Sequence, residues 1–274
     1  MPAFGLEAPA FTRGESSRSE RHVMTPERRT LTGAELKARL RDGVLLRDLE
    51  LHDADLAGTT ARQVKLRNCR FVAVSFVGAE WESLRATSCA FIGCRFDDAK
   101  LVESLFTTCV FFDPDESRGC SFARARLRFA TFTDCMLDSC IFEEADLESL
   151  TLRASRAIGA RFYKAAFAAS ATLTDNVLRY ADLRDAQLAA CDLSGNDLEW
   201  ALLDGADFSG ANLRNATLNR ASLKGASFRR ADLRNANLGG FDPRVVDARG
   251  AMLFEGQMRQ VLEALDFVVL PAGG

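Results

Sequence analysis

The sequence predicts an all-β solenoid, in which the chain coils into a four-sided rod with a short helix at each end. Between Ala181 and Gly240 every fifth residue is leucine or phenylalanine. A small residue, mostly alanine, stands two positions before each of them. A period of five fits neither an α-helix nor a β-strand. It fits a chain that turns a corner every five residues, because the large and the small residue then both point into the rod.

The five-residue spacing extends over most of the chain in three phases, at 46–111, 122–167 and 173–253. These phases predict a rod of about ten coils, roughly 50 Å long at ~4.8 Å per coil. Between the first two phases, DPDESRG at 113–119 carries a proline, a glycine and acidic residues, which predicts a loop that projects from a corner. A single extra residue near 168–170 separates the second phase from the third.

Both ends of the chain depart from this spacing. Residues 1–31 are rich in Arg, Glu, Ser and Pro, which predicts a disordered tail. Residues 32–43 predict a capping helix, with Thr32 as its N-cap and Glu35 completing a capping box. We expect this helix to cover the first coil, whose backbone groups would otherwise be unpaired. The rod itself is expected to span 44–253.

Residues 254–274 predict a C-terminal helix and tail. The apolar residues there recur at helical spacing, and they are Phe254, Met258, Val261, Leu262 and Leu265. Part of this stripe is expected to cap the last coil. The surplus is expected to join two copies of the chain in a homodimer, because a stripe this apolar needs cover.

Composition limits the function classes. The 274 residues carry a formal net charge of −3 and are 47% hydrophobic. The sequence contains no apolar run near the ~18 residues that would predict a membrane span. The N-terminus lacks a basic start followed by an apolar block, so no secretory signal is expected. These features predict a cytoplasmic protein that does not enter a membrane.

The eight cysteines are expected to be buried, reduced and unreactive. The pairs Cys89/Cys94 and Cys135/Cys140 have a C-x4-C spacing that zinc tolerates. Each cysteine, however, stands two residues before a large apolar residue, in the small inward position where cysteine acts as a small hydrophobe. The full set is Cys69, Cys89, Cys94, Cys109, Cys120, Cys135, Cys140 and Cys191. No metal site is therefore expected.

No catalytic site is expected, because a straight and filled rod offers no cleft in which reactive groups could converge. Of the two histidines, His22 lies in the tail and His52 follows Leu51 toward water. The sequence has no glycine-rich phosphate loop and suggests no Ser-His or Cys-His pairing. The prediction is a protein without enzymatic activity and without a cofactor.

The tandem A(D/N)LXX units resemble the pentapeptide-repeat proteins, whose fold is a right-handed quadrilateral β-helix. Two stretches resemble the quinolone-resistance (Qnr-type) branch of that family more closely. One is CVFFDPDESRGCSF at 109–122, which is similar to a run that forms a small projecting loop in those proteins. The other is DARGAMLFEGQMRQVLEALDFVVL at 247–270, which resembles their closing coil and dimerisation helix.

The resemblance implies a protein that binds DNA gyrase or topoisomerase IV and protects it from inhibitors, in part by mimicking duplex DNA. The proposed contacts are the projecting loop and two acidic belts, at 134–148 and 182–207. They comprise Asp113, Pro114, Asp115, Glu116, Ser117, Arg118, Asp134, Asp138, Glu143, Glu144, Asp182 and Asp207. Qnr-type proteins have a second, longer loop where this sequence adds one residue near 168–170, so the first loop is expected to carry more of the contact.

Net charge argues against mimicry along the whole rod. A ~50 Å length of duplex DNA carries about 30 negative charges. Residues 44–253 hold 29 Asp and Glu against 26 Lys and Arg. Acidic outward positions are equally expected on any water-exposed solenoid. Direct nucleic-acid binding by the basic coils at 214–234 is not expected, because exposed aromatic residues are not interleaved with the arginines.

A second function class stays open, namely a structural or adaptor protein of unknown partner, such as one attached to a secretion system. The N-terminal extension favours this class, because the Qnr-type proteins do not need one. A gyrase supercoiling assay with a fluoroquinolone separates the two hypotheses.

Overall fold

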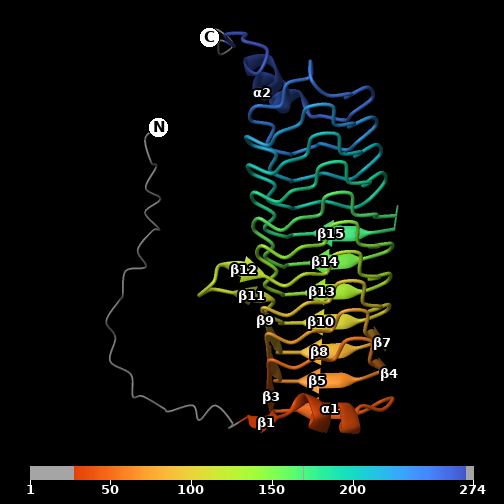
Figure 1. Cartoon of the computed structure of the whole chain (residues 1–274). Coiled ribbons are helices and arrows are strands. Elements are labelled where there is room, and N and C mark those ends of the chain that lie inside the picture. Colours follow the sequence, from red (N-terminus) through yellow and green to blue (C-terminus); the bar gives the residue numbers. More distant parts are fainter. Residues whose placement is uncertain (1–27, 169, 270–274) are drawn as a thin grey trace, which may run out of the picture.

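The computed structural model describes residues 28–168 and 170–269, so most of the predicted N-terminal tail lies outside the described residues. The described chain forms a four-sided rod of stacked parallel coils (Figure 1). Successive coils are twenty residues apart, since Leu51 stands opposite Phe71 and Phe71 opposite Phe91. The predicted all-β solenoid is confirmed, and its twenty-residue turn contains four five-residue sides.

Short strands form on several sides of the rod. One sheet contains β1 (Arg29–Leu31), β3 (Leu49–His52), β6 (Arg70–Val72) and β9 (Ala90–Ile92). A longer sheet contains β2 (Leu45–Arg47), β5 (Lys65–Arg67), β8 (Arg85–Thr87), β10 (Leu105–Thr107), β13 (Thr131–Thr133), β14 (Thr151–Arg153) and β15 (Thr172–Thr174). A third sheet pairs β4 (Thr60–Arg62) with β7 (Glu80–Glu82).

Beyond β15 the coils continue through single parallel bridges rather than strands. The longer sheet is extended from Thr172 through Asp192, Asn212 and Asp232 to Met252. The predicted extra residue near 168–170 is visible in the register, because Thr151 stands opposite Thr172, twenty-one residues later. The longer sheet continues across this insertion, because parallel pairing resumes at Thr172.

Phenylalanine rings fill the N-terminal half of the rod in columns that run from coil to coil. Phe122 is stacked between Phe96, at a centroid distance of 4.7 Å, and Phe142, at 4.9 Å. Its edge also meets Phe111 at 5.5 Å. These separations match the spacing of the coils, so each ring is held in contact with the ring of the next coil.

The small inward position accepts cysteine, as predicted, since all eight thiols are free and buried. It also accepts polar residues in one column. Asn196 accepts a hydrogen bond from the backbone N–H of Asn176 (2.9 Å), and Asn176 accepts one from Ser155 (2.9 Å). The Asn196 amide also donates to the carbonyl of Leu173 in the preceding coil (2.6 Å). These buried side chains are thus hydrogen-bonded to the backbone of neighbouring coils, as burial requires.

Burial of thiols predicts a loss of stability at alkaline pH. Burial raises the pKa of the Cys191 thiol to about 11, whereas a thiol in the unfolded chain has a pKa of about 8.5. The unfolded chain loses this proton first. The contribution of the buried thiol to the free energy of unfolding is therefore complete below about pH 8.5 and falls as the pH rises toward 11. Urea midpoints measured from pH 7 to pH 10.5 should fall less steeply for Cys191→Ala. Alanine fills the same position in the adjoining coils, at Ala171 and Ala211. Equal slopes for the two proteins would contradict this account.

The first coil is covered by α1 (Gly33–Arg39), which confirms the predicted capping helix and its capping box. The N–H of Glu35 donates to Thr32 Oγ1 (3.2 Å), and the N–H of Thr32 donates to Glu35 Oε2 (2.8 Å). One boundary differs from the prediction, because residues 29–31 do not belong to the tail. They form β1, which pairs in parallel with β3, so the backbone N–H and C=O groups at this edge of β3 are hydrogen-bonded.

The last coil is closed by η1 (Glu255–Gln257) and α2 (Met258–Glu263). The buried amide of Gln257 donates to the carbonyls of Leu233 (2.8 Å) and Ala236 (2.9 Å). Its oxygen accepts from the backbone N–H of Asn235 (3.1 Å). Gln260 adds a further bond, since its oxygen accepts the N–H of Leu238 (2.6 Å). These two side chains replace hydrogen bonds that a further coil would have made. Among the described residues, the helices fall short of the length and apolar character that crossing a lipid bilayer demands.

Candidate functional site

The predicted loop at 113–119 projects from one edge of the rod as a β-hairpin (Figure 1). Its strands are β11 (Phe112–Asp113) and β12 (Arg118–Gly119), which pair in antiparallel fashion. The Asp113 carboxylate closes the turn, because its Oδ1 accepts the N–H of Asp115 (3.1 Å) and of Glu116 (3.3 Å). This local bonding is typical of aspartate in turns and holds the hairpin in a defined shape.

The hairpin presents mainly negative charge. Residues 114–118 are exposed, whereas Phe112 and Asp113 are half-buried at its base. Arg118 forms an ion pair with Glu116 (2.9 Å), and Asp113 is engaged in the turn. Asp115 at the tip therefore offers the carboxylate that is least committed to the hairpin itself.

The first acidic belt is largely neutralised by arginines from neighbouring coils. Glu143 lies 3.1 Å from Arg161, and Arg128 pairs with both Asp146 and Glu148. These contacts join residues from adjacent coils, so the belt presents far less charge than its sequence suggests.

Asp138 differs from the prediction that it faces a partner. The residue is only 4% exposed. Its carboxylate accepts hydrogen bonds from Arg156 Nε (2.6 Å) and from the backbone N–H of Ile158 (2.9 Å). Asp138 thus ties two coils together and is not available to a second protein.

Asp182 in the second belt also differs from the prediction, because it is 8% exposed and paired with Arg184 (2.6 Å). Burial alone would raise the pKa of Asp182, but the hydrogen bonds from Arg184 outweigh it and hold the pKa below its ordinary value. Asp207 is half-buried and accepts the N–H of Ser209 (2.9 Å), which stabilises a corner. These two acids belong to the architecture of the rod.

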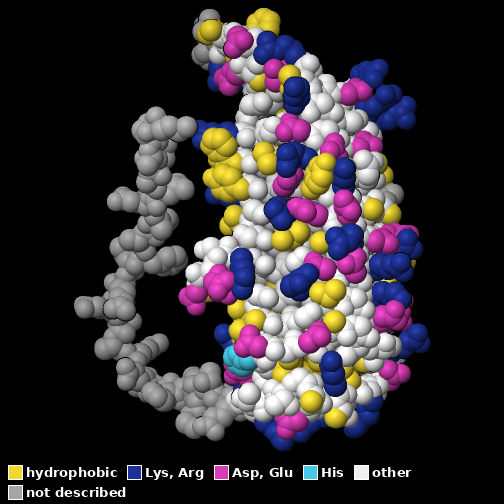
Figure 2. Space-filling model, viewed as in Figure 1, with side chains coloured by type: hydrophobic (Ala, Val, Ile, Leu, Met, Phe, Trp, Pro, Cys, Tyr) yellow, Lys and Arg dark blue, Asp and Glu magenta, His cyan; other side chains and the backbone are white. Residues whose placement is uncertain are grey.

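Asp134 and Glu144 remain the exposed acids among the predicted belt contacts. Within the described parts of the chain, neither forms an ion pair shorter than 4.0 Å. The space-filling view shows positive and negative side chains interspersed over the visible face, with acidic side chains gathered at the hairpin (Figure 2). The hairpin is therefore the most concentrated acidic feature that this view presents.

The C-terminal apolar stripe is divided between two roles. Val261 is buried against its own rod and caps the last coil, so it differs from the prediction that it forms a dimer contact. Leu262 and Leu265 are half-buried. Phe254 and Met258 are exposed at 45% and 43%. The helix is also shorter than the stripe suggested, since α2 ends at Glu263.

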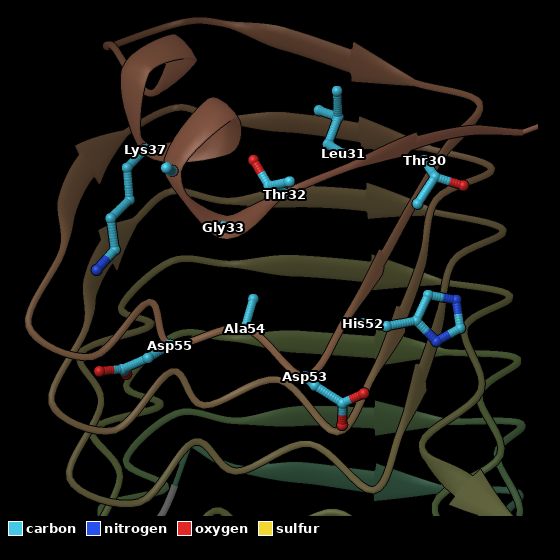
Figure 3. A pocket seen from close by; sticks show the side chains of 10 residues that line it. Thr30, Leu31, Thr32, Gly33, Lys37, His52, Asp53, Ala54 and Asp55 are labelled. Carbon is cyan, nitrogen blue, oxygen red and sulfur yellow. The ribbon is translucent and has the colours of Figure 1, made fainter.

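A hollow beside the N-terminal helix contains several polar side chains but no convergent group of them. It is lined by residues of β1, α1 and the following coil, including Lys37, His52, Asp53 and Asp55. Figure 3 shows Lys37 and His52 on opposite sides of this hollow. His52 instead contacts Glu50 on its own strand (2.9 Å). The described residues of this hollow thus give no geometry that suggests acid-base chemistry.

Sequence analysis missed two exposed aromatic residues, Tyr180 and Trp200, which lie on adjoining coils. Each stands two residues after an inward leucine, at a corner position that faces water. That position was the available signal.

Comparisons with known proteins agree with the fold. The family model described as pentapeptide repeats (8 copies) matches residues 118–153, 191–230, 201–240 and 226–259. Over 95 residues the chain is 33% identical to the quinolone resistance pentapeptide repeat protein QnrB96 of Scandinavium goeteborgense. It is 32% identical to the pentapeptide repeat protein QnrB4 of Escherichia coli, also over 95 residues. Each match covers 31% of this chain and 44% of the relative, so the chain spans less than half the length of these curated relatives.

Solved structures match over a greater length. A trypsin-treated variant of QnrB1, described as a plasmid-mediated fluoroquinolone resistance protein, shares 27% identity and a TM-score of 0.64. The match covers 81% of this chain and 99% of that one. Full-length QnrB1 shares 25% identity and a TM-score of 0.61, over 82% of this chain and all of the other.

Proposed function

We propose that this chain, which matches the pentapeptide-repeat family model in part and resembles the quinolone-resistance proteins, binds a type II topoisomerase and protects it from inhibitors. The partner would be DNA gyrase or topoisomerase IV, in the cytoplasm, and the protein itself would be non-catalytic. The observation that carries the proposal is the acidic hairpin. It projects from a rod that matches nearly the whole length of a fluoroquinolone resistance protein.

The ion pairs support a local form of DNA mimicry. The arginines that neutralise the belts leave the hairpin, with three acids and one arginine, as a concentrated negative feature. A protein that binds DNA has a basic surface, and a basic surface attracts such a feature. We therefore assign the main contact to Asp115 and its neighbours on the hairpin, with Asp134 and Glu144 as weaker contacts.

The supercoiling activity of gyrase tests the proposal. Added protein should restore supercoiling in the presence of a fluoroquinolone, and deletion of residues 113–118 should abolish the rescue. The deletion returns Phe111 and Phe122 to five-residue spacing and leaves Gly119 at the corner, so the rod is expected to stay intact.

A matched pair of variants separates the hairpin from general charge. Asp115→Asn and Asp134→Asn each remove one exposed carboxylate. The first should weaken rescue about tenfold and the second less than threefold, because contacts at the centre of an interface dominate its energy. No rescue by the wild-type protein at any concentration would reject the proposed function and favour an adaptor role.

We also propose that the C-terminal end joins two rods. Phe254 and Met258 remain exposed there, and Phe267 and Val268 extend the apolar surface at 60% and 86% exposure. A dimer with twofold symmetry would cover this surface. The variant with Phe254→Glu and Met258→Glu should sediment as a monomer of about half the wild-type mass. A monomeric wild-type protein at micromolar concentration would show that this surface has another use.

A further inference from the structure

The hairpin shares its edge of the rod with a row of corner residues from the following coils. The inward residue that precedes the hairpin is Phe111, and backbone hydrogen bonds connect its column from coil to coil. The column continues through Leu137, Ala157, Leu178, Leu198 and Leu218. The residue two places after each member occupies the same corner. These corner residues are Ser139, Gly159, Tyr180, Trp200 and Arg220, and we call this row the hairpin edge.

Three of these residues form a stack that faces water. The rings of Tyr180 and Trp200 are nearly parallel, at an interplanar angle of 10° and a centroid distance of 6.4 Å. The guanidinium of Arg220 lies 4.9 Å from the centre of the Trp200 ring. Tyr180 is 57% exposed and Trp200 is 42% exposed. Figure 2 shows hydrophobic side chains along the same edge as the hairpin, nearer the C-terminal end of the rod.

Neither the backbone nor the core requires aromatic residues at these corners. The corner conformation is left-handed, with φ of 58° at Tyr180 and 61° at Trp200. Bulky residues adopt this conformation at a cost. Gly159 on the same edge adopts it without one. The stack therefore places two large apolar surfaces in water at positions where glycine would serve the fold equally well.

The carboxylates nearest Trp200 are already paired. Glu199, next to Trp200, pairs with Arg179 (3.0 Å) and accepts a hydrogen bond from Asn219 (2.9 Å). Arg179 also pairs with Asp197 (2.6 Å). No unpaired carboxylate therefore has to be buried with the rings, and the guanidinium of Arg220 lies over the face of Trp200.

The residue types and their position indicate a protein partner. Tryptophan, tyrosine and arginine are the residues most enriched in interface hot spots. Bases of single-stranded nucleic acid also stack on such rings. The acidic hairpin lies on the same edge, about three coils or ~14 Å from Tyr180. A strand that followed this edge would bring its phosphates against the carboxylates of the hairpin. The edge instead matches a protein surface that is basic at one point and has an apolar pocket ~14 Å away.

We infer that the hairpin and the Tyr180–Trp200–Arg220 stack form a two-point docking edge for the same topoisomerase. This inference rests on the proposed function. The single extra residue near 168–170 is too short to form a second contact loop, and the inference assigns the second contact to the stack instead. The hairpin meets the basic surface of the enzyme, and the rings of Tyr180 and Trp200 enter an apolar pocket beside it.

Binding of the full-length protein to the gyrase holoenzyme with DNA, measured by biolayer interferometry, tests this assignment. Trp200→Gly and Tyr180→Gly introduce the residue that Gly159 already provides on this edge. Phe129→Gly is the matched control, because Phe129 is an aromatic corner residue with φ of 58° and 54% exposure on another edge. Should glycine loosen the corner, as thermal melting would reveal, Trp200→Asn keeps a residue that tolerates the left-handed conformation.

Trp200→Gly should raise the Kd for gyrase about 30-fold, as loss of a hot spot does. Phe129→Gly should change it less than twofold. If deletion of 113–118 abolishes binding but both stack variants bind like the wild type, the stack has no part in docking and the proposed function survives. If the wild type itself does not bind, both proposals fall. Binding of a fluorescent dT20 oligonucleotide that is lost in Trp200→Gly, with gyrase affinity unchanged, would overturn the assignment in favour of nucleic acid.

Discussion

Phe122→Ala is expected to lower the free energy of unfolding by about 3–5 kcal/mol, as loss of a fully buried phenylalanine does. Phe122 has no exposed surface and is stacked between Phe96 and Phe142. Alanine would leave a cavity that the rod cannot close, because the hydrogen bonds between coils fix their separation. The loss therefore combines the transfer energy of the ring, the cavity and the two stacked contacts.

Guanidinium chloride unfolding followed by circular dichroism measures this loss. Phe122→Leu is the control, because leucine fills the same column further along, at Leu183 and Leu203. We expect the leucine variant to lose less than half as much stability as the alanine variant. An alanine variant within about 1 kcal/mol of the wild type would mean that the coils can collapse around a missing ring.

Gly119→Ala is expected to displace the hairpin and, under the proposed function, to remove most of the rescue of gyrase. A Cβ atom at this position would lie 2.3 Å from the backbone nitrogen of Cys140 and 2.4 Å from the carbonyl oxygen of Asp138. Both contacts are with backbone of the next coil, so no side-chain rotation can relieve them. The base of the hairpin must move, and Asp115 at its tip must move with it.

Rescue of supercoiling by Gly119→Ala should be reduced at least tenfold, while the circular dichroism of the rod is retained. Gly256→Ala is the control, because a Cβ atom there meets nothing within 4 Å. Full rescue by Gly119→Ala would show either that the hairpin adapts to the displacement or that its position is irrelevant to binding.

The inward half of the molecule could be predicted from the sequence. Five-residue spacing assigned the large and small core residues, including all eight cysteines, and the structure places the thiols in the core. The capping box at Thr32 and Glu35 and the loop after Phe111 were also predicted correctly, because both depend on local residue order. Each of these features follows from residues close together in the chain.

The outward half could be predicted only in part. Asp138 was expected to face a partner, but Arg156 of the next coil covers it. Val261 was expected to join two copies, but it caps the last coil of its own chain. The strand at 29–31 escaped prediction because its pairing partner, β3, begins twenty residues later.

The sequence by itself determined which side chains point inward, because the corner spacing fixes the direction of each residue without reference to any other coil. Only the tertiary structure decided which outward residues meet. Residues about twenty apart, such as Asp138 and Arg156 or Tyr180 and Trp200, become neighbours when the coils stack ~4.8 Å apart. That stacking neutralises the acidic belts and assembles the aromatic stack.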